Sequence, residues 1–213
     1  MYIPNQYRAP DSSAPLEIIR SFPLATVISV VNGSPFVSYL PFTIAQADPT
    51  LVLTSHCARA NPHWTYFEQA PVLLIFRGPD GYISPRFYQD CTINVPSWNY
   101  VAVHCAGTAT IAPEHDTDEI LRSLVDQMEA SAQKPWRVED MDDDYLQRLK
   151  KAIVPFSVSV STLTAKFKLS QRGSDGEING LIAGLREAGT EKDRLLADAM
   201  ELGVQGRGLP DAR

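Results

Sequence analysis

A stretch of strict alternation late in the chain most constrains what this sequence can fold into. In residues 154–161, valine or phenylalanine occupies every even position and proline or serine every odd position. Successive side chains of a β-strand point to opposite faces of a sheet, so this period of two predicts a strand with one buried and one wet face. The chain must therefore build a sheet that covers one side of this strand.

The first half of the chain supplies further strands for such a sheet. Apolar runs rich in β-branched residues are found at 24–31, 36–40, 51–55, 72–76, 82–84 and 98–111. Asn32-Gly33 predicts a hairpin turn after the first run. The Gly78-Pro79-Asp80-Gly81 segment predicts a second turn, which would end the strand at 72–76.

Helical patterns lie between and after these strands. They cover residues 13–22, 61–69, 116–128, 142–151 and 178–185, and a last helix starts from a capping pair, Thr190 and Asp193, and stops at Gly203. Short strands followed by helices predict an α+β, mainly β fold: a β-barrel with peripheral and C-terminal helices. We expect a barrel domain at residues 1–170 and a C-terminal helical extension and tail at 171–213.

Composition and charge exclude several classes of protein. The 213 residues are 44% hydrophobic and carry a net charge of −6, which is globular and acidic. The acidic surface and the lack of a helix-turn-helix pattern argue against direct nucleic-acid binding. No apolar run approaches the roughly 18 residues of a membrane span, and three widely spaced cysteines predict a reducing, cytoplasmic location.

The segment Ser55–Pro62 is the first candidate site, since it joins a strand end to a helix start. Arg59 offers a planar fork of donors suited to a phosphate, and Asn61 is a good N-cap beside free backbone N–H groups. The alternative is a surface arginine followed by an ordinary cap. Both interpretations stay open on these residues alone.

Three further groups carry candidate ligand contacts. Tyr82 and Ser84 would share one face of a short strand, and Trp98 could line the ring of a flat ligand. Lys166, Lys168 and Arg172 form a cationic spot that suits an anion. The alternatives are a plain hairpin, a buried indole and solvated cations. No grouping has the spacing of a metal site or of a Ser-His-Asp triad, and no residue stands out as catalytic.

Taken in order, these pieces resemble the PaiB family. The resemblance rests on His56-x-Ala58-Arg59-Ala60-Asn61-Pro62, Phe76-x-Gly78-Pro79, Tyr82-Ile83-Ser84-Pro85, Pro96-x-Trp98-Asn99-Tyr100-x-x-Val103-His104 and Lys168-Leu169-Ser170-Gln171. It implies a split β-barrel related to pyridoxamine-phosphate oxidases, working as a homodimer with FMN near the subunit interface. It also implies a negative transcriptional regulator, which the acidic surface suggests would act indirectly.

The resemblance assigns FMN contacts to specific positions. These are Thr54, Ser55, His56, Arg59, Ala60, Asn61, Tyr82, Ser84, Trp98, Lys168 and Gln171. Arg59 and Asn61 would contact the phosphate, with Lys168 and Gln171 reaching it from the same or the partner chain. The sequence departs from the family pattern at Tyr39, Arg86, Phe167 and Arg172, and these changes would weaken flavin binding.

Two other functions fit the same barrel. One is a flavin-dependent oxidoreductase of unknown substrate. The other is binding of a different planar anionic ligand, haem or pyridoxal phosphate, with His56, His63 or His104 as the ligand that haem iron would need.

Overall fold

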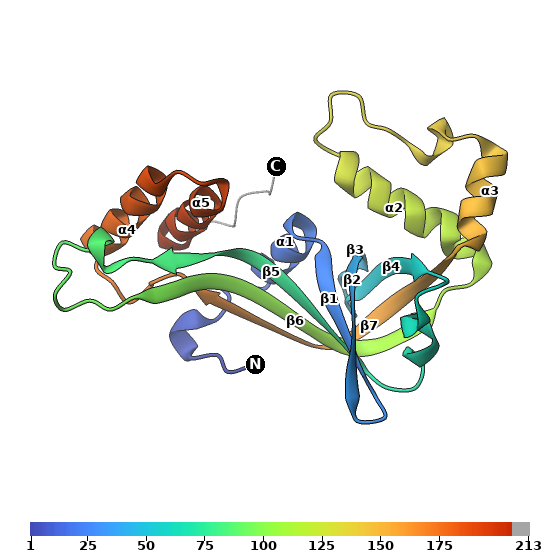
Figure 1. The fold of residues 1–213 in the computed structure, drawn as a ribbon, viewed down its shortest axis with the longest axis horizontal. Coiled ribbons are helices and arrows are strands. Elements are labelled where there is room, and N and C mark those ends of the chain that lie inside the picture. Colours follow the sequence, from blue (N-terminus) through green and yellow to red (C-terminus); the bar gives the residue numbers. More distant parts are fainter. Residues whose placement is uncertain (206–213) are drawn as a thin grey trace. The chain divides into compact units, whose positions relative to one another are not determined.

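A computed structural model describes residues 1–205 as two compact units, each assembled from separate stretches of chain. The sheet unit comprises Pro23–Phe76 and His104–Leu163, and the helical unit comprises Met1–Phe22, Arg77–Val103 and the chain from Thr164 onward. Figure 1 shows the elements of both. The division at residue 170 stays a prediction.

Seven antiparallel strands contribute to the sheet unit, as predicted for a mainly β fold. They are β1 (Leu24–Val31), β2 (Ser34–Pro41), β3 (Thr43–Gln46), β4 (Val52–Ala58), β5 (Val72–Ile83), β6 (Ser97–Ile111) and β7 (Ile153–Lys168). Their order in the sheet is β2-β1-β5-β6-β7-β4-β3. Asn32 and Gly33 both have positive φ, 50° and 79°, which confirms the predicted hairpin turn between β1 and β2.

The core of the sheet unit is aromatic. Phe42, Phe67, Phe76 and Phe156 are fully buried, and the Phe67 and Phe156 rings lie 4.4 Å apart. On β7, Phe156 and Val158 are buried while Ser157 and Ser159 are more open, which confirms the predicted alternation over these four residues; Pro155 is buried as well, and Val160 is only half-buried. Gly107 of β6 allows close approach of β7, because a Cβ there would lie 2.2 Å from the Ser159 carbonyl oxygen.

A helical insertion, residues 114–151, interrupts the sheet unit between β6 and β7. It contains α2 (Thr117–Glu129), α3 (Asp143–Lys151) and two short 3₁₀-helices, η4 (Glu114–Asp116) and η5 (Val138–Asp140). Both α-helices fall where the sequence predicts helices. The insertion holds eleven acidic and six basic side chains, so it carries −5 of the chain's net charge of −6.

The helical unit contains α1 (Ala14–Ser21), α4 (Asp175–Ala188), α5 (Glu191–Gln205) and the remaining parts of β5, β6 and β7. Two more 3₁₀-helices, η1 (Asn5–Tyr7) and η3 (Pro85–Phe87), complete it. Helices α4 and α5 pack against each other (Figure 1), joined by Gly189 with φ 77°. None of the helices in residues 1–205 is long and apolar enough to cross a membrane.

Several predicted boundaries are wrong, and close packing explains one of them. The predicted turn at Gly78–Gly81 is instead the middle of β5, which joins the runs at 72–76 and 82–84 into one strand. A Cβ at Gly78 would lie 2.9 Å from Ile18 of α1, and one at Gly81 would lie 2.8 Å from Leu196 of α5. These glycines therefore make room for helices rather than for a turn.

Two other details of the prediction also change. No local pattern is strong enough to predict β3, and the helix expected at 61–69 is a short 3₁₀-helix, η2 (Pro62–Tyr66). Gly203 lies inside α5 instead of ending it. The predicted tail lies at 206–213, outside the described residues.

Candidate functional site

The loop after β4 has the cap that the sequence predicts. The Asn61 side-chain oxygen accepts a hydrogen bond from the His63 backbone N–H at 3.0 Å, at the start of η2. Its amide nitrogen donates to the Ser38 hydroxyl at 3.0 Å. The Asn61 side chain is thus turned toward the sheet unit's interior, and its role as an N-cap is confirmed.

Arg59 in the same loop holds the end of α3. Its Nε donates to the carbonyl oxygen of Lys151 at 2.9 Å and its Nη2 to that of Ile153 at 2.8 Å. Its backbone N–H donates to the Ala152 carbonyl at 2.8 Å, so one residue satisfies three successive carbonyl groups. The last carbonyls of a helix lack partners within the helix, which is why a cation stabilises that end.

The Arg59 guanidinium still has capacity for an anion. A guanidinium carries five N–H donors, and two are used by these carbonyl groups. Among residues 1–205, no carboxylate lies within ion-pair distance of it. The carbonyl contacts fix the orientation of the fork, so its remaining donors are held in place for a ligand.

A cavity of about 520 Å³ opens beside Arg59. Its walls come from the β4–η2 loop, the start and end of the helical insertion, and the first residues of β7; they include Arg59, Trp64, His115, Lys150 and Lys151. Lys150 makes an ion pair with Asp118, whereas Lys151 has no carboxylate partner among residues 1–205. A second cavity of about 390 Å³ shares Ile111 and Ala112 with the first and is also lined by Thr54.

The predicted site residues on β4 divide between the two faces of the strand. The Thr54 hydroxyl lies 2.8 Å from that of Thr43 and lines the second cavity. Ser55 points to the opposite face, where it is buried and donates to the Pro41 carbonyl at 2.6 Å. The structure therefore brings Thr54, and not Ser55, to the cavity wall.

His56 follows Ser55 on the strand and so shares a face with Thr54. Its Nδ1 is buried without a hydrogen-bond partner in the described part of the chain. Burial lowers the pKa of the His56 side chain, since it disfavours the charged imidazolium. Ala60 is exposed in the loop that follows β4.

His63 is the centre of a buried polar network. Its Nδ1 lies 2.9 Å from the Ser38 hydroxyl and its Nε2 lies 2.9 Å from the Ser29 hydroxyl, and the ring is fully buried between Phe36 and Phe67. Because both ring nitrogens are engaged, His63 is unsuited to ligating haem iron. Burial also lowers the pKa of this histidine.

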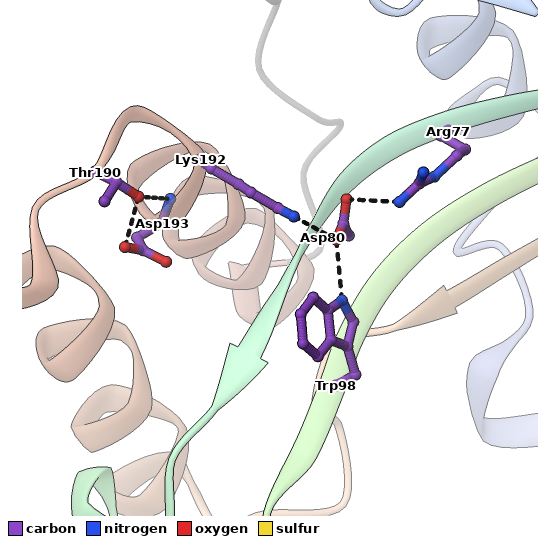
Figure 2. A network of polar contacts seen from close by, with 6 residues as sticks. All are labelled: Arg77, Asp80, Trp98, Thr190, Lys192 and Asp193. Carbon is purple, nitrogen blue, oxygen red and sulfur yellow. Dashed lines mark hydrogen bonds and ion pairs between the residues drawn. The ribbon is translucent and has the colours of Figure 1, made fainter.

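The helical unit contains the remaining predicted residues, and Asp80 organises several of them (Figure 2). The Trp98 indole N–H donates to the Asp80 carboxylate at 2.9 Å, and Lys192 of α5 forms an ion pair with the same oxygen at 2.8 Å. The Lys192 ammonium also lies 5.4 Å from the centre of the Trp98 ring. Tyr82 lies beside Trp98 with ring centres 6.3 Å apart, and both remain about half exposed.

The other predicted residues of this unit make contacts within it. Lys168 donates to the Ser97 hydroxyl at 2.9 Å and the Trp98 carbonyl at 2.7 Å, which leaves one ammonium donor. Gln171 accepts from the Leu169 backbone N–H at 2.8 Å and donates to the Phe167 carbonyl. Ser84 is buried and accepts from the Arg86 backbone N–H.

Two residues of these groups were not predicted from the sequence. Asp80 belongs to a segment that was predicted to be a turn, and Lys151 is at the end of a helix with no motif near it. Lys166, predicted as part of a cationic spot, is buried against the rings of Tyr2, Tyr7 and Tyr100 at 5.3–5.8 Å.

Arg59 lies in the sheet unit and Lys168 in the helical unit, so their convergence on one phosphate stays a prediction. Residues 1–205 contain no cluster suited to a metal ion.

Comparison with known proteins defines the class. Residues 1–162 match the family model described as "Putative FMN-binding domain". Flavocytochrome Anf3 from Azotobacter vinelandii superposes with a TM-score of 0.57 at 22% identity, covering 76% of this chain and 69% of that one. The FAD and heme binding protein from Mycobacterium smegmatis gives 0.59 at 17% identity, covering 81% and 79%. The fold is therefore that of the flavin-binding split barrels, as predicted.

A curated relative narrows this class. "Protease synthase and sporulation protein PAI 2" from Bacillus subtilis is 29% identical over 202 residues, which span 94% of this chain and 97% of that protein. The chain belongs to the FMN-binding domain family, the PaiB family that the sequence motifs resemble.

The residues at the Arg59 cavity fit the phosphate end of FMN. They supply an oriented guanidinium, a lysine without a carboxylate partner and a space within the usual range of small-molecule sites, about 300–1,000 Å³. When bound, FMN brings its own hydride and electron-transfer chemistry, and the protein contributes binding and orientation.

Proposed function

We propose that this protein binds FMN with the phosphate in the cavity beside Arg59. The observation that supports this is the guanidinium held by two carbonyl groups, with no carboxylate among residues 1–205 to neutralise it. A fixed, uncompensated fork of donors matches the geometry of a phosphate better than that of a neutral ligand.

The further proposed contacts with the flavin are those that the family motifs assign, taken one by one. Thr54, at the wall of the adjoining cavity, is the proposed contact for the ribityl chain or ring. The half-exposed pair of Tyr82 and Trp98 offers aromatic surface to the isoalloxazine. Lys168 would approach the phosphate from the same or a partner chain with its one remaining donor. Ser55, Asn61, Ser84 and Gln171 already have internal partners, which favours supporting roles for them.

A homodimer is part of the proposal, and the outer face of the β1–β2 hairpin supports it. Four cross-strand pairs on this face are apolar at every position except Thr26. They are Leu24 with Pro41, Thr26 with Tyr39, Ile28 with Val37, and Val30 with Pro35. Leu24, Val30 and Tyr39 are each about 60% exposed or more. Monomeric proteins rarely leave a contiguous apolar surface of this kind in water.

The proposed biological role is that of a cytoplasmic, PaiB-type regulator that acts indirectly. The insertion concentrates negative charge, which disfavours contact with a DNA backbone. A redox enzyme that uses the flavin's own chemistry is the alternative.

Flavin titration tests the proposed binding. We expect the purified protein to quench FMN fluorescence with a stoichiometry of one flavin per chain, and R59Q to weaken binding at least about tenfold. K134Q, which removes an exposed cation of the insertion, is the matched control and should bind as the wild type does. Circular dichroism of R59Q separates loss of ligand contacts from loss of fold. Absence of binding by the wild-type protein would refute the proposal.

Light scattering coupled to gel filtration tests the dimer. The wild-type protein should elute with twice the chain mass, and Y39D should elute as a monomer because it places a charge in the centre of the apolar face. Y145D introduces the same charge at an exposed tyrosine of α3 and should leave the dimer intact. A wild-type monomer, or an intact Y39D dimer, would count against this interface.

A further inference from the structure

The cavity beside Arg59 has a wall that does not belong to the barrel. The helical insertion contributes His115, Asp118, Gln147, Lys150 and Lys151 to it. Lys151 is the last residue of α3, and its own carbonyl oxygen accepts the hydrogen bond from Arg59 Nε at 2.9 Å. The two cationic residues are therefore immediate neighbours across the junction of loop and helix.

The insertion is strongly acidic, and yet two cations beside it, Arg59 and Lys151, have no carboxylate partner among residues 1–205. Eleven carboxylates are available within 38 residues, five more than the basic side chains they could neutralise. Lys150 uses one of them, Asp118, in an ion pair that is largely buried on the lysine side. Arg59 and Lys151 have no carboxylate partner among residues 1–205, although both line the same cavity.

We propose that Lys151 is a second cation of the phosphate site, supplied by the helical insertion, and that a phosphate bound there also steadies α3. This rests on the proposed function. Two neighbouring cations without acidic partners, in a strongly acidic segment, are suited to an external dianion such as a phosphate monoester. Two carboxylates also line the cavity: Asp118 is paired with Lys150, and Glu114 would oppose an anion but faces the two unpaired cations.

Phosphate binding would be coupled to the stability of α3, because the Arg59 guanidinium contacts both. Its Nε and Nη2 already hold the carbonyls of Lys151 and Ile153, and a phosphate would accept from the remaining donors. A ligand that restrains the guanidinium in this orientation also restrains the helix end that it caps. The helix has no fully buried side chain of its own, so the cap is a large part of what holds it.

The comparison of FMN with riboflavin isolates the phosphate term, because riboflavin lacks only that group. The wild-type protein should bind FMN more tightly than riboflavin. K151Q should lose about five- to tenfold of FMN affinity while riboflavin affinity stays unchanged. K134Q, with the same charge change at an exposed site in the insertion, should retain both affinities.

Hydrogen exchange tests the second part. FMN should slow the exchange of backbone amides in residues 146–152, and riboflavin should not. If K151Q keeps the full preference for FMN while R59Q loses it, Lys151 is not part of the site, although the proposed function stands. If FMN binds to the wild type without slowing exchange in α3, the coupling is refuted. If wild-type protein binds neither flavin, the proposed function and this inference both fall.

Discussion

The buried histidine of the sheet unit should make stability depend on pH, and H63Q is the variant that measures its share. His63 Nδ1 faces Ser38, whose hydroxyl oxygen already accepts from Asn61, while Nε2 faces Ser29. The simplest arrangement has Ser38 donating to Nδ1 and Nε2–H donating to Ser29, which is a neutral ring. Protonation would place a charge in a fully buried site with no carboxylate bonded to it.

Acidification should destabilise the protein, because the pKa of His63 is depressed in the folded state. Burial lowers the pKa of His63 below its ordinary value of 6.5, so beneath that pH the unfolded chain binds a proton that the folded chain does not. Above the pKa that His63 has in the unfolded chain, this destabilising effect is absent. As the pH drops from that value toward the pKa of His63 in the folded protein, the free energy of unfolding falls. Between pH 7.5 and 5.5 the largest loss from one histidine kept neutral is about 1.4 kcal/mol.

Urea denaturation at pH 7.5 and 5.5 provides the measurement. H63Q should be less stable than wild type at pH 7.5 by about 1–3 kcal/mol, because Ser38 loses a buried partner. Its loss of stability on acidification should be smaller than that of wild type by up to about 1.4 kcal/mol. H115Q alters a histidine whose side chain is 82% exposed, and at pH 7.5 it should cost less stability than H63Q. Equal pH dependence in H63Q and wild type would show that His63 is protonated without cost, and the reasoning would be wrong.

Three further expectations concern packing, the Asp80 cluster and the cysteines. G107A should destabilise the protein by at least about 3 kcal/mol in urea unfolding, because the new methyl meets the β7 backbone, whereas G176A has open space around it and should cost little. D80A removes the shared acceptor of Trp98 and Lys192 and should cost about 1–2 kcal/mol, a loss that the exposed E187A should not reproduce; an unchanged melting temperature would contradict the role given to Asp80. Burial raises the pKa of Cys57 to about 11 and that of Cys105 to about 12, so at pH 8 a thiol reagent should modify only the exposed Cys91 until the protein unfolds; rapid reaction of two or three thiols in the folded state would contradict this.

Much of the fold was accessible from the sequence, where local patterns agree with the final packing. The Asn32-Gly33 turn and the alternation in residues 154–161 both depend on backbone geometry that neighbouring residues set. The Gly78–Gly81 segment misled because its glycines serve contacts with Ile18 and Leu196, which are far away in the chain. No local pattern distinguishes a glycine that turns the chain from one that admits a helix.

The candidate site could be predicted only in part. Residue types and the cap at Asn61 follow from chemistry and local spacing, and the structure confirms the cap. The Arg59 guanidinium donates to the carbonyl groups of Lys151 at the end of α3 and Ile153 at the start of β7, which lie 92 and 94 residues further along, and no motif encodes these tertiary contacts. The alternation of β4 could have shown that Ser55 and Thr54 face opposite sides of the strand, although the resemblance assigns both residues to the flavin.

The clasp of Arg59 on three successive carbonyl groups has a consequence for how this protein can diverge. Lysine could not replace it, because a single ammonium cannot span the oxygens of residues 151 and 153 in the same planar manner. In a homologue that lacks the insertion, this arginine would no longer be needed to hold the end of α3. In a homologue that keeps the insertion, we expect the arginine to be kept as well. Transplanting the insertion into another barrel would therefore require moving this arginine with it.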